Sequence, residues 1–121
     1  MCMNAVTKKP LVGGVGVDIV ELDRFRGLRF PARIAELVLT PREYACYETH
    51  ADALAYLASR FAAKEAVIKA YPGGLTYHDV EITKDGKKPK VKLLVRRPKT
   101  REVSVSLSHS VDYVAGFAIA I

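Results

Sequence analysis

The amino-acid sequence predicts an α+β protein in which an antiparallel sheet packs against one long helix and several shorter helices. Three observations carry this prediction. An apolar, β-branched segment opens the chain, alanine-rich runs with helical spacing fill its middle, and apolar and polar residues alternate between turn signals in its last third. The 121 residues suffice for one core, so we expect a single domain over residues 1–121.

The first strand is expected at residues 12–20, which are apolar and β-branched. Its run GGVGVD matches neither the dinucleotide-binding pattern nor the Walker motif, so we reject a phosphate-binding loop. Residues 1–10 are expected to form a loose tail without the apolar core of a signal peptide. The apolar run that follows is short and is broken by Asp18. We therefore expect a cytoplasmic protein that does not enter a membrane.

Short helices are expected between residues 21 and 50. Residues 21–30 are polar and arginine-rich and predict a turn or short helix. Pro31 fits the first position of the next helix. Apolar residues follow it at helical spacing: Ile34, Leu37 and Val38. A further helix is predicted to start with Thr40 as its N-cap, Pro41 at its first position and Glu43 closing a capping box.

The longest helical pattern covers residues 52–71 and ends at Pro-Gly-Gly. Its apolar stripe consists of Leu54, Leu57, Phe61 and Ile68. The stretch RFAAKEAVIKAY, residues 60–71, places charged side chains in the middle of this helix. Glu65 and Lys69 lie four residues apart and share a face, and such a pair ordinarily supports a helix by a few tenths of a kcal/mol. An ion pair and a metal-and-phosphate site are the two interpretations.

The last third of the chain predicts an antiparallel meander. Strands are expected at residues 80–83 and 91–95, around a hairpin turn centred on Asp85-Gly86. Residues 103–107 alternate apolar and small polar side chains, as a half-buried strand does. Residues 113–121 are apolar enough for a final interior strand.

The net charge of +6 is concentrated in two stretches, residues 24–42 and 84–101. Such asymmetry indicates an acidic partner, which is nucleic acid, a phosphorylated ligand or an acidic protein. The second stretch has no interleaved aromatic residues and no recognised nucleic-acid motif, which argues against a nucleic-acid-binding module. The two cysteines lack metal-ligand spacing and are expected to be free thiols in a reducing compartment.

Several polar residues are candidates for contact with a ligand or partner. Asp18 lies in an apolar strand, where a buried and unpaired carboxylate is costly, so we expect it at the end of the sheet or beside a partner such as a cation. Ser108 and His109 end a strand, where they can donate hydrogen bonds to a phosphate. Asp18 and Glu65, with few other protein ligands, suit Mg²⁺, and lysines suit the remaining phosphate charge. The residues thus predict a Mg²⁺-dependent reaction on a phosphate-bearing substrate.

Three stretches resemble one known family. GVDIVELDRF, residues 16–25, resembles its pattern G-(I/V)-D-(I/V)-x-x-(I/L)-x-R, and FAAKEAVIKA, residues 61–70, resembles F-(A/S)-x-K-E-A-x-x-K-A. LSHS, residues 107–110, is similar to its third motif, (I/L)-S-H-(S/T). The resemblance as a whole extends over residues 12–121, in order and with no missing element. The chain therefore resembles the holo-acyl-carrier-protein synthases, the small, trimeric type of 4′-phosphopantetheinyl transferase.

The resemblance implies the 4′-phosphopantetheinyl transferase fold and a specific reaction. The family transfers 4′-phosphopantetheine from coenzyme A to a serine of apo-acyl carrier protein, releases adenosine 3′,5′-bisphosphate and supports fatty acid biosynthesis. By this resemblance Asp18 and Glu65 hold Mg²⁺, and Lys69 contacts the phosphates and protonates the leaving group. The base that takes the serine proton is left open between a water on the metal and a nearby carboxylate.

The resemblance also implies partner and substrate contacts. Arg24 matches the family's arginine for docking the acidic carrier, whereas Arg26 and Arg29 are inferred from charge alone. Family members are homotrimers with sites at subunit interfaces. The family's turn D-x-x-G-(K/R)-P reads DGKKP here, with an extra lysine. The residues expected to bind coenzyme A are Arg60, Lys64, Lys69, Gly86, Lys88, Pro89, Ser108 and His109. For Lys64 two roles are left open, contact with the substrate and contact with a neighbouring carboxylate.

The alternative to an active enzyme is a non-catalytic relative that binds coenzyme A or a nucleotide. The presence of all three residues expected to be catalytic, Asp18, Glu65 and Lys69, argues against it.

Overall fold

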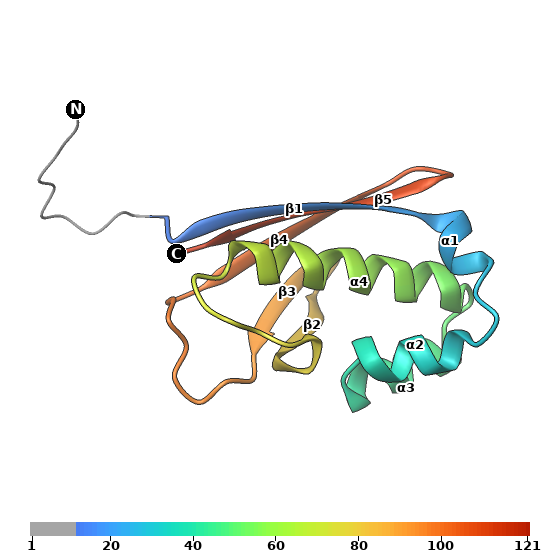
Figure 1. Cartoon of the computed structure of the whole chain (residues 1–121), viewed down its shortest axis with the longest axis horizontal. Coiled ribbons are helices and arrows are strands. Elements are labelled where there is room, and N and C mark those ends of the chain that lie inside the picture. Colours follow the sequence, from blue (N-terminus) through green and yellow to red (C-terminus); the bar gives the residue numbers. More distant parts are fainter. Residues whose placement is uncertain (1–11) are drawn as a thin grey trace, which may run out of the picture.

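One long helix lies along an antiparallel sheet, and the smaller elements surround its other sides, as Figure 1 shows for the computed structural model. The structure describes residues 12–121, so the expected N-terminal tail lies outside the described residues. The elements are β1 (Gly14–Glu21), α1 (Leu22–Arg26), α2 (Pro31–Val38), α3 (Pro41–Thr49), α4 (Ala53–Ala70), the 3₁₀ turn η1 (Tyr77–Asp79), β2 (Val80–Asp85), β3 (Lys88–Leu93), β4 (Val103–His109) and β5 (Tyr113–Ala120). The predicted α+β class is confirmed.

The strands form two sheets instead of the single meander expected. The three-stranded sheet has the order β1-β5-β4, and β2 pairs only with β3. In the larger sheet Asp18 lies opposite Gly116, and Gly116 lies opposite Leu107 on its other side. Alternation along a strand identifies its buried face but not the strand edge to which it bonds. For that reason the pairing of the first strand with the last was not predicted.

The β2–β3 hairpin is tighter than expected. Asp85 and Lys88 are paired across the ladder, so the loop consists of Gly86 and Lys87 and is not centred on Asp85-Gly86. Gly86 has a φ of 64°, which a residue with a Cβ adopts reluctantly. Glycine at the first of two loop positions is the arrangement that matches strand twist in a tight hairpin.

Helix caps appear where the sequence predicts them. Pro31 and Pro41 occupy first-turn positions, and Thr40 with Glu43 forms a complete capping box. Asp52 caps α4 by accepting a hydrogen bond from the Ala55 N–H at 3.2 Å. Within residues 12–121, no helix has the length and apolar character needed to cross a bilayer.

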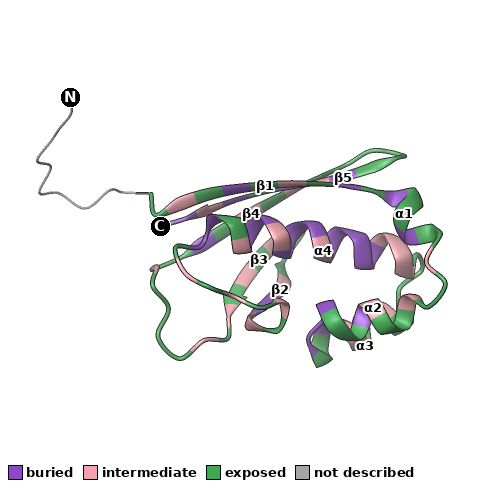
Figure 2. Ribbon diagram, viewed as in Figure 1, coloured by how far each residue is buried: buried purple, intermediate pink, exposed green. Residues whose placement is uncertain are grey.

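Helix α4 is buried on nearly all sides, as Figure 2 shows, and not along one stripe. Of the four residues in the predicted stripe only Leu57 is fully buried. The rest of its buried surface is largely alanine: Ala58, Ala62, Ala63, Ala66 and Ala70. The sheet covers one side, and Val80 and Ile82 of β2 pack against the core that the C-terminal half of α4 forms. Small side chains let these layers approach closely.

Three glycines set the distance between the sheet and α4. A Cβ added to Gly14 or Gly16 would lie 2.0 Å from the carbonyl oxygen of Ala70 or Ala66 respectively, and one added to Gly116 would lie 2.8 Å from that of Ala62. All three distances are too short for real atoms, so a side chain at any of these positions pushes the layers apart.

We expect Gly16→Ala to lower the free energy of unfolding by at least roughly 2–3 kcal/mol, because the new methyl group meets backbone that cannot rotate away. Urea unfolding measures this loss. Gly74→Ala is the matched control, since no atom lies within 4 Å of its added Cβ. Equal stability of the two variants would contradict the close packing of β1 on α4.

Candidate active site

Asp18 lies on the face of β1 that packs against α4. Strand residues alternate between faces, so Asp18 shares its face with Gly16 and Val20, which are both buried. Its side chain is 17% exposed, and its Oδ1 accepts a hydrogen bond from Lys69 Nζ at 3.3 Å. Its Oδ2 is buried and has no hydrogen-bond partner among residues 12–121. A buried oxygen in this state is a ready ligand for a cation.

Lys69 connects α4 to this strand. Its Nζ donates to the carbonyl oxygen of Val17 at 3.0 Å and to Asp18. In the described part of the chain its ion pair is with Asp18, and no ion pair with Glu65 is present. The interpretation of Glu65 and Lys69 as a helix-supporting pair is therefore wrong. The Lys69 side chain remains 54% exposed, so it is accessible to a ligand.

Glu65 lies one helical turn before Lys69 and on the same face of α4. Its Oε2 accepts a hydrogen bond from the Tyr77 hydroxyl at 3.1 Å. Burial raises the pKa of Tyr77, and Glu65 and Asp18 raise it further, so the hydroxyl is a donor at neutral pH. Lys69 contacts Asp18 and shares a face of α4 with Glu65, which places both carboxylates on the side of the helix that carries Lys69.

The donor set of this site fits Mg²⁺. Among residues 12–121 there is no group of three or more histidine, cysteine or acidic side chains that could enclose a metal ion. Mg²⁺ does not require such a cage, because it keeps several waters and binds through one or two carboxylates and substrate phosphates. Asp18 provides an oxygen without a partner among the described residues, and Glu65 lies on the face of α4 that carries Lys69, the partner of Asp18. Two carboxylates leave coordination positions of Mg²⁺ for water and for the phosphate oxygens of a substrate.

Lys64 does not belong to this site, contrary to the expectation that it binds coenzyme A. Its side chain is fully buried, and Nζ lies 2.6 Å from Glu43 Oε1. The ammonium group also donates to the carbonyl oxygens of Val38 at 2.7 Å and Tyr77 at 2.9 Å. These contacts use its three N–H donors. Burial lowers the pKa of Lys64, and Glu43 opposes this shift.

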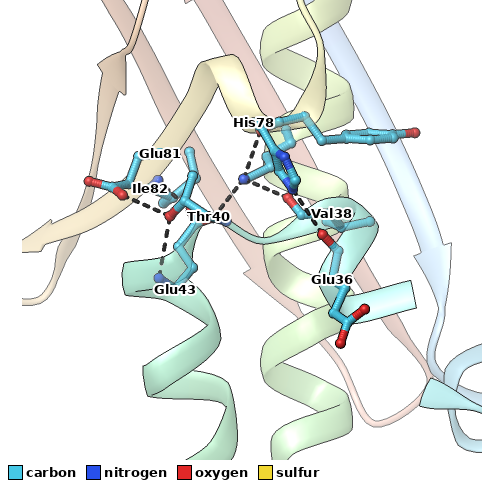
Figure 3. Close-up of polar contacts among 9 residues, drawn as sticks. Glu36, Val38, Thr40, Glu43, His78, Glu81 and Ile82 are labelled. Carbon is cyan, nitrogen blue, oxygen red and sulfur yellow. Dashed lines mark hydrogen bonds and ion pairs between the residues drawn. The ribbon is translucent and has the colours of Figure 1, made fainter. Parts of the chain in front are cut away.

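The partner of Lys64 is held by a buried polar network, drawn in Figure 3. Glu43 Oε1 accepts from the Thr40 N–H at 2.9 Å, and its Oε2 accepts from the Ile82 N–H at 2.7 Å. The Thr40 hydroxyl donates to Glu81 Oε2 at 2.7 Å. The network joins the start of α3 to β2, and Lys64 joins both to α4.

Arg60 is also buried and engaged within the chain. Its guanidinium lies over the Tyr56 ring at 4.5 Å, and NH1 donates to the Ser59 hydroxyl at 3.0 Å. Burial raises the pKa of Tyr56 to about 12, and the nearby Arg60 opposes the shift. Contact of Arg60 with a nucleotide stays a prediction, although its Nε has no partner among the described residues.

The remaining residues expected to bind coenzyme A lie apart from the acidic site. Ser108 and His109 end β4, which β5 separates from β1, and both are exposed. Lys88 and Pro89 line a surface pocket of about 640 Å³ between β3 and β4, and Gly86 lies in the adjoining loop. That volume is in the range of small-molecule sites. The predicted site residues Lys88 and Pro89 therefore lie in this pocket, whereas Ser108 and His109 are not part of its lining.

The arginines expected at a partner surface are on α1 and the loop after it. Arg24 is exposed. Arg26 instead pairs with Asp52, with NH2 3.0 Å from Oδ2, and this contact links α1 to the N-cap of α4. Arg29 lies over the Phe30 ring at 5.5 Å, and Arg33 of α2 lies over the same ring at 4.8 Å.

Sequence reasoning missed Tyr77 and the role of Glu43 beyond the cap. Thr76 and Asp79 form a capping box around η1, and the spacing of threonine and aspartate is a signal for that turn. No local pattern connects Tyr77 to Glu65 or Glu43 to Lys64, because these contacts join distant parts of the chain.

Comparisons with known proteins agree with this fold. Residues 14–121 match the family model described as the 4′-phosphopantetheinyl transferase superfamily. The chain belongs to this superfamily of transferase enzymes. Within it, the chain is similar to the holo-[acyl-carrier-protein] synthase of Pediococcus pentosaceus, with 40% identity over 86% of this chain and 92% of that protein. The synthase of Moorella thermoacetica is 41% identical over 86% and 90% of the two chains.

Solved structures show the same relationship in three dimensions. The holo-[acyl-carrier-protein] synthase of Neisseria meningitidis matches with a TM-score of 0.81 and 31% identity, over 92% of this chain and 99% of that one. The Bacillus anthracis synthase, solved in complex with coenzyme A (3′,5′-ADP), matches with a TM-score of 0.77 and 27% identity, over 90% and 96%. The predicted 4′-phosphopantetheinyl transferase fold is therefore confirmed.

Proposed function

We propose that the protein is a holo-[acyl-carrier-protein] synthase. It transfers 4′-phosphopantetheine from coenzyme A to a serine hydroxyl of apo-acyl carrier protein, with Mg²⁺ as cofactor and adenosine 3′,5′-bisphosphate as the second product. Its place is the cytoplasm, in support of fatty acid biosynthesis. The observation that carries the proposal is the meeting of Asp18, Lys69 and Glu65 between β1 and α4 in a chain whose relatives are synthases.

The roles follow from the chemistry of phosphoryl-type transfer, in which positioning and charge neutralisation supply most of the catalysis. Asp18 and Glu65 would hold Mg²⁺, which when bound neutralises charge on the phosphate oxygens of the substrate. Lys69 is held by Asp18 and the Val17 carbonyl, and its exposed ammonium can donate to a phosphate oxygen and protonate the departing one. The attacking group is the serine hydroxyl of the carrier.

The acidic carrier would dock on α1 and α2. Arg24, Arg29 and Arg33 are exposed there. Phe30 and Leu37 are each more than half exposed on the same segment. A basic surface with apolar residues suits an acidic helical protein, since the charges steer the approach and the apolar residues supply contact area. Arg26 contributes less, because Asp52 already holds it.

The outer face of the three-stranded sheet supports a homotrimer. It exposes large apolar side chains on two neighbouring strands: Val15, Val17, Ile19, Tyr113 and Phe117. Contiguous apolar patches of this kind mark protein contacts. If copies of the chain pack through this face, one subunit would supply the acidic site. The neighbouring subunit would supply the pocket residues Lys88 and Pro89, and also Ser108 and His109 at the end of β4.

The direct test incubates the protein with coenzyme A, Mg²⁺ and an apo-acyl carrier protein and weighs the carrier by mass spectrometry. We expect the carrier to gain one phosphopantetheine arm, and we expect no gain with EDTA or with a carrier whose acceptor serine is alanine. Absence of any gain across several carriers, while coenzyme A still binds, would instead identify a non-catalytic relative.

A further inference from the structure

Tyr77 is the one uncharged side chain that makes a hydrogen bond to the acidic site in the described part of the chain. Its hydroxyl donates to Glu65 Oε2 at 3.1 Å, and the contact is partly buried. Its ring packs on Phe61, one turn before Glu65, with 5.8 Å between ring centroids. Neither its position nor its residue type follows from the motifs that mark Asp18, Glu65 and Lys69.

The backbone that carries Tyr77 is held on both sides. Its carbonyl oxygen accepts from the buried Lys64 ammonium at 2.9 Å. The capping box between Thr76 and Asp79 closes the turn around it, with Thr76 N–H donating to Asp79 Oδ2 at 2.8 Å. His78 Nε2 pairs with the Glu36 carbonyl oxygen at 2.9 Å, as Figure 3 shows. The hydroxyl is therefore presented to Glu65 from a rigid turn.

A fixed donor on one carboxylate oxygen restricts what the other oxygen can do. The side chain of Glu65 has three rotatable bonds, and a free glutamate loses entropy when it binds a metal ion. The Tyr77 hydroxyl engages Oε2 and so leaves Oε1 as the oxygen available for a cation. Groups that orient metal ligands in this way typically change metal affinity by 10–100-fold.

We propose that Tyr77 is a positioning residue for the magnesium site, which orients the Glu65 carboxylate through its hydroxyl. This inference rests on the proposed function of the site. Lys64 lies outside this site but fixes the backbone of Tyr77, because its ammonium donates to the Tyr77 carbonyl oxygen. The Tyr77 hydroxyl in turn donates to Glu65.

The test is the variant Tyr77→Phe, which removes only the hydroxyl and keeps the ring on Phe61. The full-length protein is titrated with Mn²⁺ in the presence of coenzyme A, and free Mn²⁺ is measured by its electron paramagnetic resonance signal. We expect the Mn²⁺ dissociation constant, and the Mg²⁺ concentration for half-maximal transfer, to rise roughly 10-fold. Turnover at saturating Mg²⁺ should stay close to that of the wild type.

Two further variants separate this role from a general loss of structure. Tyr71→Phe also removes a hydroxyl, one that accepts from the Lys99 N–H at 2.6 Å, and should leave Mn²⁺ binding unchanged. Glu65→Asp withdraws the carboxylate from the hydroxyl. In that background Tyr77→Phe should weaken Mn²⁺ binding no further, because the hydroxyl acts only through Glu65.

The outcomes distinguish this inference from the proposed function. Wild-type protein that transfers the arm, with Tyr77→Phe showing unchanged Mn²⁺ and Mg²⁺ dependence, would overturn the inference and leave the function intact. Additive losses in the Glu65→Asp background would also overturn it. Wild-type protein that neither binds Mn²⁺ nor transfers the arm would overturn both.

Discussion

Asp18→Asn and Glu65→Gln are each expected to lower the transfer rate by roughly 100-fold or more at any Mg²⁺ concentration, because each removes a metal-binding charge worth several kcal/mol in the transition state. Both replacements keep the size of the side chain. Asp18→Asn breaks the ion pair between Asp18 and Lys69. The Lys69 side chain is more than half exposed, and a pair of this kind contributes little to the free energy of unfolding. The melting temperature should therefore change little.

Rates from a coupled or mass-spectrometric assay, with thermal melts run in parallel, measure this difference. Glu48→Gln is the matched control, since Glu48 is an exposed glutamate of α3 away from the site. An Asp18→Asn protein that retains wild-type turnover would remove Asp18 from the metal site and return it to a purely structural position.

Lys64→Met is expected to lower the free energy of unfolding by roughly 3–5 kcal/mol, because it leaves the buried Glu43 carboxylate without its counter-charge. The carbonyl oxygens of Val38 and Tyr77 lose a donor as well. Urea unfolding measures the loss. Adding Glu43→Gln should restore part of it, since the uncompensated charge is then gone.

Lys69→Met is expected to differ from Lys64→Met in both stability and transfer rate. Lys69 is half exposed, so its loss should cost less than about 1 kcal/mol of stability and reduce transfer instead. The two lysines of one helix are thus expected to give opposite results in the two assays. A Lys64→Met protein as stable as the wild type, with weakened coenzyme A binding, would contradict the structural role of Lys64.

Much of the site is predictable from local sequence. A carboxylate in an apolar strand, Asp18, and a charged cluster within an alanine-rich helix both stand out from the pattern that burial requires. The capping residue Thr40 is likewise visible, because a cap acts on neighbours within three residues. The structure confirms these features where the sequence places them.

The contact partner of each of the three charged residues in α4 was not predictable from local sequence. Lys64, Glu65 and Lys69 differ in role because of what faces each of them: Glu43 from α3, Tyr77 from η1 and Asp18 from β1. These partners lie far away in sequence. The spacing of Glu65 and Lys69 favoured a pair that the structure does not form, since the Val17 carbonyl and Asp18 offer Lys69 a better acceptor set.

The sequence by itself determined the α+β class, the starts of the short helices and the family, because these depend on periodicity, caps and motifs read along the chain. Only the tertiary structure decided the pairing of β1 with β5, the close packing of α4 on glycines and the separation of Lys64 from the site. Each of these depends on contacts between distant segments. Whether a charged side chain meets solvent, a ligand or a buried partner is settled by its neighbours in space.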